Sequence, residues 1–165
     1  MPLRENNSSS YFATLYEEEY KVEGDNKLVA MALVCLQCPN PNSKTKENWV
    51  LSKDDYKKVY EELGVENGDK IAKIVFICAD PDYPKPGTFL FSKISEQLKN
   101  LKKTHIFLTQ ADILTENNKF DELNTKKVKQ WYSDRGFQTF KNKKLQEVNT
   151  GTDVYEKPMY LKLTS

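Results

Sequence analysis

Several features that mark common protein classes are scarce in this sequence of 165 residues. It has one histidine, His105, and three cysteines, so neither a Ser-His-Asp or Cys-His centre nor a disulfide framework is expected. The longest apolar run, residues 28–36, is the size of a strand, whereas a membrane helix needs about 20 residues. Residues 1–10 are polar and lack the apolar core of a signal peptide. These absences predict a soluble, cytoplasmic protein.

A strong excess of charge of either sign is also missing. Lys and Arg total 25 and Asp and Glu total 24, so the formal net charge of +1 creates no overall attraction for nucleic acid or an anionic membrane. Short lysine clusters at residues 99–103, 126–129 and 141–144 are expected to be solvated helix faces, with a nucleic-acid surface or attraction of phosphate groups as the alternatives. The aromatic content of 12% argues against disorder. The length predicts one domain over residues 11–165, after a flexible tail at residues 1–10.

The spacing of apolar residues predicts an α/β (α+β) fold, a mixed and largely antiparallel twisted sheet with helices on both faces. Strands are expected at residues 11–22, 28–38, 71–79, 105–109, 137–140 and 159–163, and helices at 53–63, 90–101 and 123–135. The apolar run at 71–79 predicts a central strand buried on both faces. The polar connection at 141–153 is expected to be mobile.

Side chains at helical spacing indicate which face of each helix is buried. In the first helix, Ser52 is the expected N-cap and Gly64 the expected end. The stripes that would line the second and third helices are Leu90, Ile94, Leu98 and Leu101, and Leu123, Val128, Trp131 and Tyr132.

The loop between the strand at 71–79 and the helix that follows is a candidate anion site. Such a loop places backbone N–H groups at a helix N-terminus, where the helix dipole favours a pyrophosphate. Gly87 would allow a close approach of the backbone, Thr88 would cap the helix or contact phosphate, and Lys85 would add positive charge. The alternative is a proline-stiffened turn before a core helix.

Metal binding is not expected. Cys35 and Cys38 have no second pair of ligands, and residues three apart on a strand point to opposite faces. Cys78 is expected to be an inert core residue and His105 to be structural.

Three stretches, in this order, resemble the GNAT N-acetyltransferase superfamily. Residues 74–89, IVFICADPDYPKPGTF, look like its central strand, pyrophosphate loop and helix. Residues 131–137, WYSDRGF, look like its Tyr-x-x-x-Gly-Phe signature, and residues 159–163, MYLKL, look like its closing strand. The resemblance covers somewhat more than half of the chain. It implies a GNAT-like fold, acetyl-CoA as co-substrate, and transfer of an acetyl group to an amine of a small molecule or a protein.

The resemblance also implies roles for particular residues. Tyr132 would protonate the departing thiolate as general acid, with simple packing as the alternative. Asp80 is a candidate general base, as are Glu17, Glu18 and Glu19, and their alternative is a solvated or loop-capping carboxylate. The residues that would hold the cofactor are Phe76, Ile77 and Cys78 on the strand, Lys85, Pro86, Gly87, Thr88 and Phe89 in the loop, and Asn124 and Thr125. The alternative role of Asn124 and Thr125 is to N-cap the third helix.

The loop departs from the family pattern at two positions. Pro84 stands where the family has Gln or Arg, and Phe89 stands where it has Gly or Ala. The alternative function is therefore a GNAT-like binding protein that has lost the cofactor site. An amine acceptor is the expected partner, and a homodimer is a further expected assembly.

Overall fold

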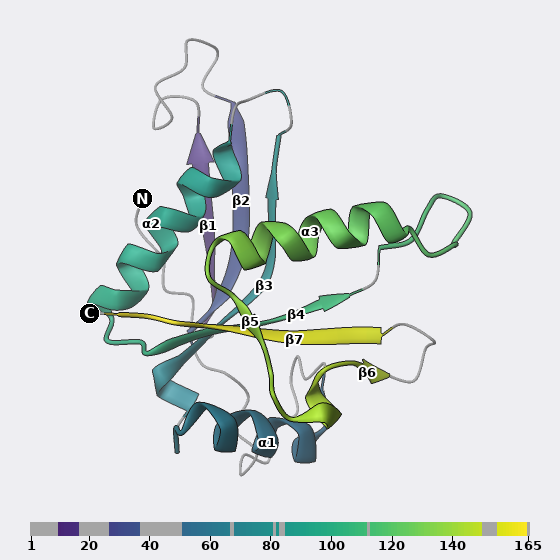
Figure 1. Ribbon diagram of the computed structural model, residues 1–165. Helices are drawn as coiled ribbons and strands as arrows, with labels where there is room; N and C mark the ends of the chain where they lie inside the picture. Colours follow the sequence, from purple (N-terminus) through teal and green to yellow (C-terminus); the bar gives the residue numbers. More distant parts are fainter. Residues whose placement is uncertain are drawn as a thin grey trace. The chain divides into compact units, whose positions relative to one another are not determined.

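The computed structural model describes residues 10–16, 27–36, 51–66, 68–80, 82, 85–111, 113–149 and 155–164. Among these residues, no helix has the length and apolar character needed to cross a membrane. The elements, in chain order, are β1 (Ser10–Tyr16), β2 (Leu28–Cys35), α1 (Lys53–Leu63), η1 (Gly68–Lys70), β3 (Ile71–Ala79), α2 (Pro86–Asn100), β4 (His105–Ala111), α3 (Glu122–Asp134), β5 (Gln138–Thr139), η2 (Lys143–Leu145), β6 (Val148–Asn149) and β7 (Tyr155–Lys162) (Figure 1).

The predicted α/β class with a mostly antiparallel sheet is confirmed. The strands hydrogen-bond in the order β1-β2-β3-β4-β7-β5, with β6 on β7. The chain divides into two compact units. The first contains β1, β2, β3 and α2, and the second contains α1, α3, β5, β6 and β7. β4 begins in the first unit and continues in the second from Phe107.

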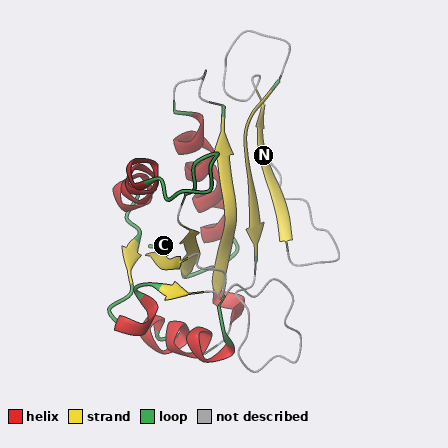
Figure 2. Cartoon of the chain, turned by 90° about the vertical axis from the view of Figure 1, so that its right-hand side faces the viewer, coloured by secondary structure: helices red, strands yellow, loops and turns green. Residues whose placement is uncertain are grey.

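In the first unit, α2 packs along one side of β1, β2 and β3 (Figure 2). The strands pair antiparallel, and residues that face each other alternate between buried and partly exposed. The buried side chains come from both layers, namely Ala13, Leu15, Ala30, Ala32 and Val34 of the strands and Leu90, Ile94 and Leu98 of α2. This layer confirms most of the stripe predicted for α2.

β3 is not buried along its whole length, which corrects the prediction for residues 71–79. Ile71–Ile74 are buried, whereas Val75, Phe76, Cys78 and Ala79 are exposed. A continuous apolar run shows that both faces of a strand tolerate burial, but it does not show that both faces are covered. Cys78 is therefore an exposed thiol and not the core residue that we expected.

The second unit has a core of aromatic rings. Phe107 of β4 makes edge-on contacts with Tyr56 of α1 and with Phe140, at centroid distances of 6.0 and 6.1 Å. The caps predicted for α1 are confirmed. Ser52 accepts a hydrogen bond from the backbone N–H of Asp55, and Gly64 adopts the left-handed conformation with φ of 68°.

Two of the leucines predicted to be buried are exposed. Leu101 lies just past the last helical residue of α2, where helical spacing no longer holds it on the buried face. Leu123 is 65% exposed, because it lies five residues before Val128 and is therefore about 140° away from it around the helix.

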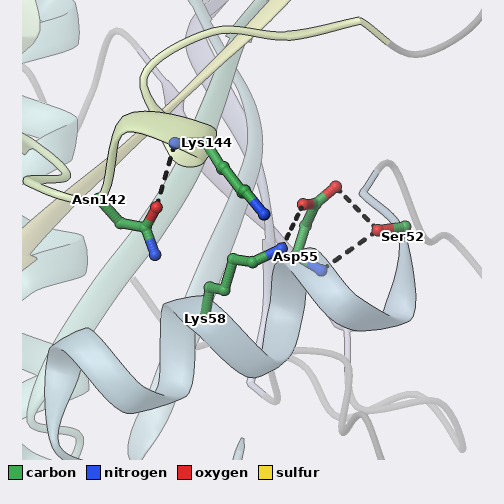
Figure 3. A network of polar contacts seen from close by, with 5 residues as sticks. All are labelled: Ser52, Asp55, Lys58, Asn142 and Lys144. Atoms are coloured by element: carbon green, nitrogen blue, oxygen red, sulfur yellow. Dashed lines mark hydrogen bonds and ion pairs between the residues drawn. The ribbon is translucent and has the colours of Figure 1, made fainter.

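The connection after β5 has more structure than the sequence predicts. It contains η2 and β6, and the side chain of Leu145 in η2 is fully buried. Asn142 caps η2 by accepting a hydrogen bond from the N–H of Lys144, and the ion pair of Asp55 with Lys58 lies near the start of α1 (Figure 3).

Glu62 connects α1 to the segment that follows β5, and both belong to the second unit. Its two carboxylate oxygens accept hydrogen bonds from the backbone N–H groups of Lys141 and Asn142, at 2.9 and 2.8 Å. A carboxylate is a strong acceptor, so this pair of bonds fixes residues far apart in the sequence.

We expect Glu62→Ala to lower the free energy of unfolding by about 2 kcal/mol, because two backbone donors lose a charged acceptor. Chemical denaturation followed by circular dichroism measures this change. Glu61→Ala is the matched control, since Glu61 is the exposed neighbour on the same helix. An equal loss of unfolding free energy in Glu61→Ala and Glu62→Ala would contradict the role given to Glu62.

Candidate functional site

A β-bulge lies in the middle of β3. Val34 of β2 faces Ile74 and the next residue, Leu33, faces Phe76, so Val75 is the extra residue. A bulge adds one residue to a strand. Each residue after it therefore points to the opposite face of the sheet from the one it would have in a regular strand. Phe76 and Cys78 are therefore turned away from the face that α2 covers, whereas Ile77 is turned toward it.

Asp80 follows directly after β3 and extends its pairing by one residue. Its N–H donates to the carbonyl of Val29 at 2.8 Å. Its carboxylate Oδ1 accepts a hydrogen bond from the N–H of Asp82 at 2.9 Å, which is the loop-capping role given as its alternative. This bond holds the side chain of Asp80 in place at the end of the strand.

The N-terminus of α2 has the features expected of an anion site. Its N-cap residue is Lys85, in the left-handed conformation with φ of 51°, and it makes no side-chain capping hydrogen bond. Pro86 has no N–H, and the first intrahelical bond runs from Phe89 N–H to Lys85 carbonyl. Gly87 and Thr88 lie in this first turn, before the first intrahelical donor.

Phe89 is the residue of this turn that fits an anion least. Its half-buried ring lies 5.6 Å from the ammonium nitrogen of Lys93, one turn further along α2. The ring occupies space in the first turn of the helix. The cation beside it adds positive charge near the helix N-terminus.

Asn124 and Thr125 do not N-cap α3, which corrects the alternative role given to them. Asp121 is the N-cap, and its carboxylate accepts from Asn124 N–H at 3.1 Å. The side-chain amide of Asn124 donates to the other oxygen of the same carboxylate at 2.8 Å. Asn124 thus stabilises the cap from the third helical position.

Thr125 is buried and joins α3 to the end of β4. Its hydroxyl accepts a hydrogen bond from Ile113 N–H at 3.0 Å, and its carbonyl accepts one from the amide of Gln110 at 2.9 Å. The Oε1 atom of Gln110 is buried and has no hydrogen-bond partner among the described residues. Gln110 was not named as a candidate from the sequence. Its amide side chain in the largely apolar strand His105–Ala111 is the signal that could have identified it.

Tyr132 is half-buried among aromatic rings. Trp131 and Phe137 meet it edge-on at centroid distances of 5.2 and 5.5 Å. Burial raises the pKa of its phenol above the ordinary value of 10.0. The group therefore carries its proton throughout the neutral range, as a general acid must. The same contacts also satisfy the alternative role in packing.

The structure groups the predicted site residues in two sets, one in each unit. Phe76, Ile77, Cys78, Asp80 and the loop residues Lys85–Phe89 belong to the first unit, and Asn124, Thr125 and Tyr132 belong to the second. Glu17, Glu18, Glu19, Cys38 and Pro84 lie outside the described residues. Within the described part of the chain, no group of three or more His, Cys, Asp or Glu residues is placed to hold a metal ion.

The sequence matches no protein-family model and no curated protein. Solved structures are similar to it in fold. An N-acyl amino acid synthase from uncultured soil microbes matches with a TM-score of 0.58 and 13% identity, over 95% of this chain and 74% of that one. An aminoglycoside 6'-N-acetyltransferase complexed with coenzyme A matches with a TM-score of 0.54 and 10% identity, over 96% and 76%. An acetyltransferase of the GNAT family from Staphylococcus aureus Mu50 matches with a TM-score of 0.51 and 13% identity, over 96% and 70%.

These structures establish that the chain has the GNAT fold, as the resemblance predicted. The match extends over nearly the whole chain, including the N-terminal half, in which the sequence showed no family motif. At this level of identity, the likeness concerns the fold and leaves function to the residues of this chain.

We expect Thr125→Val to lower the free energy of unfolding by about 1–3 kcal/mol, because the partly buried N–H of Ile113 loses its acceptor while the shape is kept. Thr125→Ser retains the hydroxyl and is the matched control. Denaturant titration of both variants measures the difference. A serine variant as unstable as the valine variant would show that the methyl group matters instead.

Proposed function

We propose that the protein is an acetyl-CoA-dependent N-acetyltransferase that moves an acetyl group to an amine. The observation that supports this function most is the N-terminus of α2, which follows β3 without a side-chain cap in a chain that has the GNAT fold. A helix end of this kind binds phosphate groups because its N–H groups and dipole favour negative charge.

The first unit would hold the cofactor. Gly87 and Thr88 would donate their N–H groups to the pyrophosphate, with the exposed Lys85 supplying positive charge. The backbone of Phe76, Ile77 and Cys78 would hold the acetyl group along the second half of β3. The exposure of this half supports the proposal, because a strand that binds a substrate must leave surface for it.

The leaving group requires a proton donor. The amine nitrogen forms a bond to the acetyl carbon, and the bond from that carbon to sulfur breaks. Tyr132 would give its proton to the thiolate, and the proton lost by the amine would pass to Asp80 or to water. Protonation lowers the barrier because a thiol leaves more easily than a thiolate.

The second candidate function is a binding protein that has lost the cofactor. Phe89 favours it, since its ring occupies the first turn of α2, where a pyrophosphate requires a close approach to backbone. Pro86 favours it as well, because it removes one of the N–H groups of the turn. The two functions differ in one measurable property, which is affinity for acetyl-CoA.

Acetyl-CoA should stabilise the protein if α2 holds its pyrophosphate. At a concentration of 100 times the dissociation constant, the expected gain in the free energy of unfolding is about 2.7 kcal/mol. Gly87→Glu should abolish this gain with the fold retained, because it places a negative side chain against the phosphates. Ser92→Glu is the control, since it adds the same charge at an exposed position in the next turn of α2.

Thermal unfolding and isothermal titration calorimetry measure the effect in each variant. Absence of binding by the parent protein at millimolar acetyl-CoA would refute the enzyme and leave the binding protein. Equal affinity of parent and Gly87→Glu would show that the loop does not contact the phosphates.

Tyr132→Phe tests the general acid, because it removes the hydroxyl and keeps the ring. We expect kcat to fall by roughly 10²–10⁴-fold with little change in KM, since the proton is needed only in the transition state. Release of CoA in the presence of a panel of amines measures turnover. Trp131→Phe is the control for packing, because Trp131 contacts the same ring. A Tyr132→Phe variant as active as the parent would exclude this role.

A further inference from the structure

β1 is the strand at one end of the sheet (Figure 1). It pairs with β2 along one side, and no strand among the described residues pairs with its other side. We call this other side the outer edge of β1. An edge of this kind presents a row of backbone N–H and C=O groups, which is a template for pairing with the strand of another chain.

The sequence of β1 lacks the features that keep an edge strand from such pairing. Its seven residues, SYFATLY, include no charged residue, no proline and no glycine. Its pairing with β2 is regular from Ser10 to Leu15, and the register shifts only between Leu15 and Tyr16. Natural proteins commonly protect an edge strand with charges, proline or a bulge that twists the edge away. The outer edge of β1 is therefore suited to pairing.

The opposite end of the sheet is protected by short strands. β5 and β6 both pair with β7, and each has two residues. Very short edge strands offer too few backbone groups to hold a second strand. Of the two ends of the described sheet, only the one formed by β1 therefore has a long edge strand.

We propose that β1 pairs with β1 of a second copy of this chain, antiparallel and around a two-fold axis, so that the sheets of two copies join. The register that pairs all seven residues places Ala13 opposite Ala13, and Thr14 opposite Phe12 of the second copy. Since each copy uses the same edge, the assembly closes at two copies. This dimer is independent of the proposed function.

The composition of β1 favours its own copy as the partner. In a self-paired strand, a charge near the axis lies beside the same charge of the second copy, and like charges are destabilising there. The absence of charge from β1 removes this repulsion. A strand of a different protein would be selected by opposite charges or by pockets for its side chains. β1 offers no charge for such a selection.

The exposure of Tyr16 agrees with this pairing. Tyr16 is the last residue of β1 and is 40% exposed. In the proposed register, Ser10 of the second copy lies opposite Tyr16 and covers part of its side chain. Removing apolar surface from water in this way is favourable, and it occurs twice in a symmetric dimer.

The dimer should be weak. Stable complexes bury about 1,600 Å² in total, and smaller interfaces are typical of transient association. One pair of seven-residue strands is an interface of the smaller kind. We therefore expect an equilibrium between monomer and dimer at micromolar concentrations.

Sedimentation velocity of the parent protein over a concentration series tests the dimer. The average mass should rise from 19.2 kDa toward twice that value. Hydrogen exchange of the peptide that contains β1 locates the contact, because its backbone N–H groups should exchange more slowly at high concentration, whereas those of α1 should not. A parent protein that stays monomeric at submillimolar concentration would overturn the proposal, and so would a dimer in which exchange in β1 is unchanged.

Thr14→Lys and Thr14→Glu test whether the partner strand is β1 itself. Thr14 lies on the face of the sheet opposite α2, since it alternates with the buried Ala13 and Leu15. In the proposed register, its diagonal neighbour is Thr14 of the second copy. Each variant alone should weaken the dimer by about fivefold through like-charge repulsion. An equal mixture of the two variants should restore association, because opposite charges then meet.

Leu28→Lys is the matched control. It adds the same charge to an exposed position on the same face, but on β2, one strand away from the axis. It should associate like the parent protein. Circular dichroism verifies the fold of each variant. Association of Thr14→Lys equal to that of the parent, or a mixture that associates no better than either variant alone, would overturn the pairing of β1 with its own copy.

Discussion

The bulge at Val75 is the constraint on which the candidate site of the first unit depends. It lies between a buried half and a largely exposed half of β3 and reverses the facing of Phe76 and Cys78. In a regular strand, these side chains would join the core beneath α2. The bulge therefore separates the residues that stabilise the sheet from those that are available to a ligand.

The same strand leads directly to the candidate anion site at the N-terminus of α2. β3 ends at Ala79, Asp80 holds the turn through Asp82, and α2 starts at Pro86. The core side chains of α2, such as Leu90 and Ile94, fix the direction of its axis against the sheet. The helix N-terminus is therefore set by packing on the covered face, whereas the exposed side chains are set by the bulge. One short segment thus contains both the candidate anion site and an exposed apolar surface.

Local signals predicted those elements whose structure depends on near neighbours. The caps of α1 are an example, because Ser52 and Gly64 act within one helical turn. The bulge at Val75 was not predictable, since its register is determined by pairing with β2, about 40 residues away in the sequence. Gln110 and Thr125 depend in the same way on a contact between a strand and a helix. The sequence therefore predicted the strand and the helix that form the candidate site, but not the facing of their side chains.

The exposed half of β3 also explains why its composition was misleading. An apolar run such as Ile71–Ala79 is expected in a strand with both faces covered, and Ile71–Ile74 follow this rule. Beyond the bulge, the apolar side chains are retained although water reaches them. Leaving them exposed forfeits about 25 cal/mol for each Å² that burial would remove from water. A molecule that covers these side chains would recover part of that energy, so their exposure favours binding along the second half of β3.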